Sequence, residues 1–228
     1  MQKGICHVSQ IPLRGEPRSS AEMVSQLIYG ETYTVLKQED DWYLIKMDFD
    51  GYEGWLSNSS IHEYVSRERH VQQDIFANLQ NDIIGGPLIS SMGSEVTTPS
   101  YNQDKVYIQD LAKKFLGTPY LWGGRHFSGI DCSGFVQIVY KVLGIHLPRD
   151  ASQQQKVGKP VAFEDLFIGD LVFFEKMERI THVGMVIGVG LVIHAHGMVR
   201  IDTLTKAGIL NTDTMSQSHS YHSAKRLR

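Results

Sequence analysis

The sequence is poor in cysteine, in long apolar runs and in any excess of one charge. Only Cys6 and Cys132 occur among its 228 residues, so no disulfide framework remains if one of them is catalytic. No run approaches the ~18 apolar residues that span a bilayer, and the first residues lack the apolar region of a secretory signal peptide. A formal net charge of −3 does not favour nucleic acid or an anionic membrane. These absences predict a cytoplasmic protein with no nucleic acid and no membrane among its partners.

Cys132 opens a predicted helix. Apolar residues follow it at helical spacing, and Gly144 is the stop signal; the apolar positions are Phe135, Val136, Val139, Tyr140 and Leu143. The unpaired N–H groups and the positive dipole end of a helix N-terminus favour an anion. A thiol placed there should ionise more easily, and the thiolate is the nucleophile. The alternative is that Cys132 is a small buried hydrophobe.

Two histidines supply a candidate base and a group to orient it. His182 and His194 lie in β-branched apolar runs separated by the short turn Gly188-Val189-Gly190, which is typical of a hairpin. Neighbouring strands lie about 4.8 Å apart, so two facing imidazoles can hydrogen-bond. His182 would then take the thiol proton, and His194 would hold the ring of His182. A single histidine at a strand end would more often be an ordinary surface or core residue.

Several short motifs together resemble the NlpC-type papain-like cell-wall peptidases. They occur in order from Lys105 to the C-terminus and comprise Tyr120-Leu121-Trp122-Gly123-Gly124, Asp131-Cys132-Ser133-Gly134, Leu147-Pro148-Arg149-Asp150, Gly169-Asp170-Leu171-Val172-Phe173-Phe174, Thr181-His182-Val183-Gly184 and Ile193-His194-Ala195. The resemblance implies an α+β papain-like domain with helices packed on an antiparallel sheet. It also implies that Cys132 is the nucleophile, His182 the general base and His194 the third, polar member of a triad.

No cofactor is expected. His194 and His196 form a His-x-His pair that could bind a metal, but no Cys, Asp or Glu follows at ligand spacing. The sequence therefore predicts no metal site.

The first 65 residues predict a small β-barrel. Five short strands bounded by turn residues are expected at 5–8, 23–27, 32–36, 42–47 and 53–56. The run Gly51-Tyr52-Glu53-Gly54-Trp55-Leu56 resembles the closing strand of bacterial SH3-like domains, with Trp55 expected in the core. The predicted organisation is an SH3-like domain at 1–65, a connector at 66–103 and an NlpC-type domain at 104–228.

Further elements are expected around these domains. Within the connector, 71–79 reads as a short helix broken by Gly85-Gly86-Pro87. A helix with one apolar face should run from Asp104 to Gly117 and pack beside the Cys132 helix. A short polar helix is expected at 151–156, and strands are expected at 169–174, 199–201 and 221–227.

The resemblance implies a substrate. NlpC-type enzymes cleave the γ-D-glutamyl to diamino-acid bond of peptidoglycan peptides, and members with a leading SH3-like domain tend to need a free N-terminal L-Ala. Asp131 and Tyr52 could bind that ammonium, and Ser133 could hold the D-Glu α-carboxylate. The alternatives are a helix cap for Asp131, a surface strand residue for Tyr52 and a plain first-turn residue for Ser133.

Two more residues have competing interpretations. Oxyanion donors are needed for the tetrahedral intermediate, and the N–H of Cys132 and the hydroxyl of Tyr120 are candidates; simple core packing is the alternative for Tyr120. Arg149 is either a structural ion-pair partner, which we favour, or a ligand for a substrate carboxylate.

The predicted function is a cysteine peptidase of cell-wall recycling, in which the first domain blocks one end of the groove. A related thiol acyltransferase or amidase on a non-wall substrate, and a non-catalytic wall-binding protein, are the other possibilities.

Overall fold

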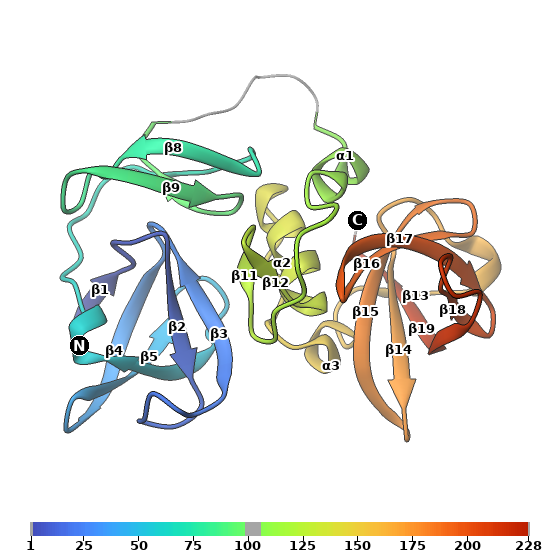
Figure 1. Cartoon of the computed structure of the whole chain (residues 1–228), viewed down its shortest axis with the longest axis horizontal. Helices are drawn as coiled ribbons and strands as arrows, with labels where there is room; N and C mark the ends of the chain where they lie inside the picture. The colour runs from blue at the N-terminus through green and yellow to red at the C-terminus, as the bar shows by residue number, and fades with distance from the viewer. Residues whose placement is uncertain (1, 99–105, 228) are drawn as a thin grey trace.

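A computed structural model describes residues 2–98 and 106–227. The chain forms two β-rich units with a layer of short helices between them (Figure 1). Strands hold 45% of the residues and helices 12%, so the expected α+β description fits only loosely. None of the helices in the described part of the chain is long and apolar enough to cross a membrane.

The first unit is a six-stranded antiparallel sheet in the order β1-β4-β5-β6-β2-β3. Its strands are β1 (Lys3–Ile5), β2 (Gln10–Arg14), β3 (Met23–Ile28), β4 (Thr32–Glu39), β5 (Trp42–Met47) and β6 (Glu53–Ser57), followed by the 3-10 turn η1 (Asn58–Ser60). Four of the five predicted strands are confirmed, and the first is shorter and earlier than predicted. The sixth, β2, is missing from the prediction; it contains Pro12, a residue that does not favour a strand.

The structure explains how Pro12 is tolerated. It pairs with Gln26 of β3, whereas β2 meets β6 at a single residue pair, Arg14 with Trp55. A strand that is paired mainly along one side can place a residue without an N–H on its other side. Trp55 is only half-buried and lies under Lys37, so its expected place in the core is wrong; Leu56 occupies the core instead.

The connector contains strands, not the predicted helix over 71–79. Its elements are β7 (His70–Val71), β8 (Phe76–Gln80), β9 (Pro87–Ser91) and β10 (Glu95–Val96), with β7 paired to β10 and β8 to β9. Burial alternates along β8, which is the period of a strand. Gly85 and Gly86 take positive φ values in the β8–β9 turn. The predicted chain break at Gly85 and Gly86 is confirmed, but the helix predicted over 71–79 is wrong.

The helix layer comprises α1 (Ile108–Lys113), α2 (Cys132–Val142) and α3 (Ala151–Gln154), with the small hairpin of β11 (Arg125–His126) and β12 (Gly129–Ile130). α2 begins at Cys132 and is followed by Gly144 at φ 74°, as predicted. α1 packs beside α2 but is shorter than predicted. Residues 99–105, which include the predicted start at Asp104, lie outside the described residues. Tyr107 and Leu116 are exposed, so the predicted apolar face does not extend over the whole segment.

The second unit is a strongly curved antiparallel sheet. Its strands are β13 (Lys159–Val161), β14 (Leu171–Lys176), β15 (Arg179–Gly188), β16 (Leu191–His196), β17 (Met198–Thr205), β18 (Gly208–Leu210) and β19 (Gln217–Arg226), with the 3-10 turn η2 (Phe163–Asp165) after β13. β19 pairs with both β14 and β18, so six strands close on themselves and β13 extends the edge of β19. α2 packs on the outside of β15 and β16.

One apolar cluster joins the two units. It contains α2 residues such as Phe135 and Val139, sheet residues such as Phe173 and Ile193, and Ile28 from the first unit. The first unit is therefore packed directly against the helix layer that begins with Cys132.

Candidate active site

Cys132 is the first residue of α2, and Asp131 caps the helix. The side chain of Asp131 accepts a hydrogen bond from the N–H of Gly134 at 2.7 Å, the geometry of an N-cap. A cap at this position fixes where the helix starts and therefore where the thiol points. The helix-cap interpretation of Asp131 is confirmed.

The free thiol of Cys132 does not ionise easily. Burial, followed by the negative charge of Asp131, raises its pKa to about 12, although backbone hydrogen bonds at Val183 and Ser133 and the charge of Arg149 act in the other direction. The expectation drawn from the helix N-terminus alone is wrong because only 6% of the residue is exposed. The thiol needs a neighbouring base.

His182 and His194 lie on paired strands, as predicted. β15 and β16 form a hairpin, and His182 Nε2 lies 2.8 Å from His194 Nδ1. The backbone hydrogen bond to the sulfur of Cys132 comes from Val183, the residue after His182. The same hairpin thus reaches the thiol.

Asp202 extends this chain and was missed from the sequence. Its Oδ2 lies 3.0 Å from His194 Nε2, and its other contacts include Arg200 and Thr212. It is fully buried on β17, beside β16. The available signal in the sequence was Asp202, a charged residue in the alternating run Val199-Arg200-Ile201-Asp202. In the structure Arg200 pairs with His194, and Asp202 lies two residues further along the same strand.

The order of the groups determines the proton positions. Burial tends to raise the pKa of Asp202, but hydrogen bonds from His194, Arg200 and Thr212 hold it below its ordinary value. An ionised carboxylate only accepts, so His194 Nε2 donates to it and His194 Nδ1 accepts from His182 Nε2–H. His182 then has its lone pair on Nδ1. Burial and the neighbouring histidines lower the pKa of His182 well below 6.5, so the ring is neutral and able to take a proton.

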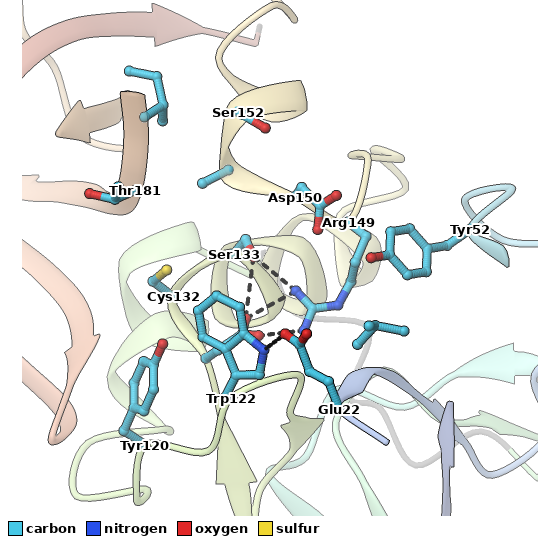
Figure 2. Close-up of a pocket in the computed structure, with 14 residues that line it drawn as sticks. Glu22, Tyr52, Tyr120, Trp122, Cys132, Ser133, Arg149, Asp150, Ser152 and Thr181 are labelled. Carbon is cyan, nitrogen blue, oxygen red and sulfur yellow. Dashed lines mark hydrogen bonds and ion pairs between the residues drawn. The ribbon is translucent and has the colours of Figure 1, made fainter. Parts of the chain in front are cut away.

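A cavity of about 430 Å³ opens beside Cys132 (Figure 2). Its lining includes Thr181 from the second unit and Glu22, Val24 and Tyr52 from the first. Tyr120, Trp122, Ser133, Arg149 and Asp150 line it from the helix layer and the loops beside it. Burial, and then the charges of Cys132 and Asp131, raise the pKa of Tyr120, so its hydroxyl stays protonated. The structure brings Tyr120, Asp131, Ser133 and Tyr52 to one cavity with Cys132.

Arg149 makes the ion pair that its structural interpretation predicts. Its guanidinium binds both carboxylate oxygens of Asp131, with Nη1 at 3.0 Å from Oδ1, and donates to Ser133 Oγ at 2.8 Å and Ser25 Oγ at 3.1 Å. Asp131 also accepts from the N–H of Gly123 at 2.9 Å. Both oxygens of Asp131 are therefore occupied by groups of the protein.

The first unit contributes two polar groups to the far end of the cavity. Figure 2 shows Glu22 and Tyr52 on the side opposite Cys132 and Tyr120. Trp122 Nε1 donates to Glu22 Oε1 at 2.6 Å. Tyr52 hydrogen-bonds Asp150, and burial together with the charge of Asp150 raises the pKa of Tyr52 to about 12. Glu22 was not predicted because it lies more than 100 residues before Cys132 in the chain. Asp150 belongs to the motif Leu147-Pro148-Arg149-Asp150, but no role was predicted for it.

A second cavity of about 680 Å³ lies beside His182. His182, His196 and His219 line it, and Tyr120 and Thr181 border both cavities. The ring of His219, from β19, stacks on His182 with centroids 4.0 Å apart. Ligand nitrogens of His182, His194 and His219 lie within 4.8 Å of one another. His196 is not part of this group.

Comparisons with known proteins give the family. Residues 117–218 match the NlpC/P60 family, and residues 13–61 match the bacterial dipeptidyl-peptidase SH3 domain. A Bacillus subtilis (strain 168) protein named gamma-D-glutamyl-L-lysine dipeptidyl-peptidase is 30% identical over 213 residues, covering 75% of this chain and 71% of the relative. A Bacillus cereus protein of the same name is 26% identical over 228 residues, covering 76% and 67%.

A solved structure shares the whole fold. An NlpC/P60 family protein from Bacillus cereus ATCC 10987 superposes with a TM-score of 0.84 at 22% identity, covering 99% of each chain. Both units and their arrangement are therefore found together in another protein. The chain belongs to the NlpC/P60 family and has a bacterial SH3 domain in front of its family domain.

Proposed function

We propose that this protein is a cysteine peptidase that hydrolyses the γ-D-glutamyl to diamino-acid bond of peptidoglycan-derived peptides with a free N-terminal L-Ala. The observation that carries the proposal is the cavity shared by Cys132 and the first-unit residues Glu22 and Tyr52. Family membership and the names of the two Bacillus relatives support a peptidase of wall peptides.

The proton chain suits attack by a thiol. His182 Nδ1 takes the proton of Cys132, and the thiolate attacks the γ-carbonyl carbon of D-Glu. The resulting imidazolium is stabilised through His194 by the buried Asp202. Collapse of the intermediate breaks the C–N bond, and His182 gives its proton to the leaving amine. Water then attacks the thioester with His182 again as base, which releases the acid and restores the thiol.

Two donors are available to the tetrahedral oxyanion. The first-turn N–H groups of α2 have no carbonyl one turn earlier to bond with, and the N–H of Cys132 is among them. The hydroxyl of Tyr120, which stays protonated, is the second donor. Donors held in place before the reaction stabilise the charge that develops in the transition state.

The far end of the cavity suits an ammonium group. Glu22 and Asp150 present carboxylates there and Tyr52 a hydroxyl, whereas Asp131 has both oxygens engaged by Arg149 and backbone N–H groups. We therefore assign the substrate amine to Glu22, Asp150 and Tyr52, with Asp131 behind them as a fixed negative charge. This changes the expected role of Asp131 and keeps that of Tyr52.

The D-Glu α-carboxylate has a single cationic partner among the described residues that line this cavity. That partner is Arg149, and Ser133 lies beside it. An arginine held by a carboxylate can still direct a free N–H at a second anion, because its guanidinium carries five donors.

A cavity closed by the first unit accepts a short peptide end but not the middle of a long chain. We therefore propose that the enzyme acts on already processed wall fragments, in the recycling of the cell wall in the cytoplasm. Degradation of intact sacculi as fast as of free tripeptide would contradict this part.

The test is cleavage of L-Ala-γ-D-Glu-meso-diaminopimelate and of the same peptide acetylated at its amine. We expect cleavage of the free-amine peptide only, and none by Cys132→Ala. Glu22→Gln should lower kcat/KM for the free-amine peptide by about tenfold, because one charged partner of the ammonium is lost. Glu16→Gln is the matched control, since Glu16 is an exposed residue of the same unit that pairs with Arg18.

The outcomes separate the parts of the proposal. Equal cleavage of both peptides would retain the peptidase and reject the amine site. Cleavage of neither would reject the peptidase, and formation of an acyl-enzyme that passes only to amines would favour an acyltransferase.

A further inference from the structure

Three imidazoles from three strands, including the proposed base, lie close together. His182 on β15, His194 on β16 and His219 on β19 place ligand nitrogens within 4.8 Å of one another. The proton chain uses His182 and His194 but not His219. The cluster therefore contains one more histidine than the proposed reaction requires.

The hydrogen bonds determine which nitrogen each ring can offer. His194 Nε2 is held by Asp202 at 3.0 Å, so Nδ1 is the atom that faces the cluster. His182 presents Nε2, which lies 2.8 Å from that atom. His219 Nδ1 lies 2.9 Å from Ser218 Oγ, which leaves Nε2 for a ligand.

We propose that His182, His194 and His219 form a binding site for a zinc-class divalent cation, and that occupation of this site inhibits the enzyme. Three histidines with one open position are a common zinc ligand set, with Zn–N distances of about 2.0–2.1 Å. The fourth position would face the second cavity and hold water. Asp202 would orient His194 as the carboxylate behind a metal-bound histidine.

The site requires a limited rearrangement. Nitrogen ligands of a tetrahedral zinc lie about 3.4 Å apart, as the Zn–N distance dictates, so the His182–His194 pair must open slightly and His219 must move closer. His219 must also rotate out of its stack with His182, because parallel rings cannot both aim their lone pairs at one ion. His219 is half-buried and borders the second cavity, which leaves it room to turn.

Inhibition follows from the tautomer of His182. In the free protein Nε2 carries the proton and Nδ1 the lone pair. A metal on Nε2 displaces that proton, and the neutral ring then carries it on Nδ1, so no proton is lost overall. An Nδ1–H cannot accept the proton of Cys132. This inhibitory effect rests on the proposed role of His182, whereas the metal site itself does not.

Binding of Zn²⁺ is measured by titration calorimetry on Cys132→Ala, which removes the thiolate as a competing ligand. We expect one site, an affinity at least tenfold lower when His219→Gln is added, and little change with His196→Gln. His196 is the matched control because it lines the same cavity outside the ligand group. His219→Cys should restore binding, since a thiolate is also a zinc ligand, and this guards against a fold defect in His219→Gln.

Activity gives a separate readout. In the enzyme with Cys132 intact, Zn²⁺ should slow peptide cleavage less in His219→Gln than in His196→Gln. Absence of Zn²⁺ binding to Cys132→Ala, or equal affinity with and without His219, would overturn the site. Inhibition of the intact enzyme without binding to Cys132→Ala would place the metal on the thiol instead. Calorimetric binding by a protein that cleaves no wall peptide would retain the site and reject only the proposed function.

Discussion

Glu31 is the buried carboxylate that ties the first unit to the helix layer. Its oxygens accept from Arg125 Nη1 and Nη2 at 2.7 and 2.9 Å and from Lys141 Nζ at 2.7 Å. The side chains of Glu31 and Arg125 are completely buried, and that of Lys141 is 2% exposed. Replacing Glu31 with glutamine keeps the shape but leaves two buried cations short of a negative partner.

The expected cost is large because the ions cannot reach water. Removing one partner of a buried pair costs about 3–5 kcal/mol. Lys141 retains Glu95 at 3.0 Å, but no second carboxylate of the described residues accepts a hydrogen bond from Arg125, which otherwise donates to Gln137 and to the carbonyl of Gln26. For a chain of this size each kcal/mol lowers the melting temperature by about 2–4 °C. Glu31→Gln should therefore lower it by roughly 6–20 °C.

The assay is thermal unfolding followed by circular dichroism, with Glu16→Gln as the control. Glu16 forms an exposed ion pair with Arg18, and Glu16→Gln should have the same melting temperature as the parent protein. Since Glu31 joins the first unit to the helix layer, Glu31→Gln should also weaken binding of the free-amine peptide by loosening the wall that carries Glu22 and Tyr52. A melting temperature within about 2 °C of the parent would refute the reasoning.

The ion pairs of Glu31 with Arg125 and Lys141 also predict how the stability of the protein depends on pH. Burial alone would raise the pKa of Glu31, but Arg125 and Lys141 outweigh it and lower the pKa from 4.5 to about 2. A carboxyl with a depressed folded-state pKa stabilises the protein above its unfolded pKa, and this contribution is lost as the pH falls from 4.5 towards 2. The difference in melting temperature between parent and Glu31→Gln should thus be constant above pH 5 and shrink below pH 4.5.

Three further predictions concern the site and its frame. Asp202→Asn should lower kcat by about 10²-fold with little change in KM, because the imidazolium loses its buried counter-charge; an unchanged kcat would exclude Asp202 from the proton chain. Tyr120→Phe should lower kcat by about 10²–10³-fold if its hydroxyl is an oxyanion donor; an effect on KM alone would assign it to substrate packing. Gly123→Ala should destabilise more than Gly117→Ala in urea unfolding, because both have positive φ but only a Cβ at Gly123 would lie 2.3 Å from the carbonyl oxygen of Met23; equal losses would contradict this.

Local sequence was enough for elements that are built from neighbours along the chain. The start of α2 at Cys132 follows from a capping residue and an apolar period. The pairing of His182 with His194 follows from two β-branched runs and a short turn. In both cases the residues that determine the structure lie within about one element of each other, so propensity and turn chemistry suffice. The prediction failed at 71–79, where a helical period was assigned to residues that form a strand. It also failed at β2, a strand that contains Pro12 and is paired mainly on one side.

Tertiary structure decided everything that depends on distant segments or on burial. Glu22 and Tyr52 reach the cavity only because the first unit packs on α2, and His219 meets His182 only because β19 returns beside β14. The pKa of Cys132 is likewise set by exclusion of water, which no spacing along the chain reveals. The sequence by itself determined the helix that begins at Cys132, the paired histidines and most of the strands of the first unit, since these depend on residues close together in the chain. The far end of the cavity at Glu22 and Tyr52, the position of Asp202 and the third histidine of the proposed metal site required the fold, because packing brings these residues together from separate elements.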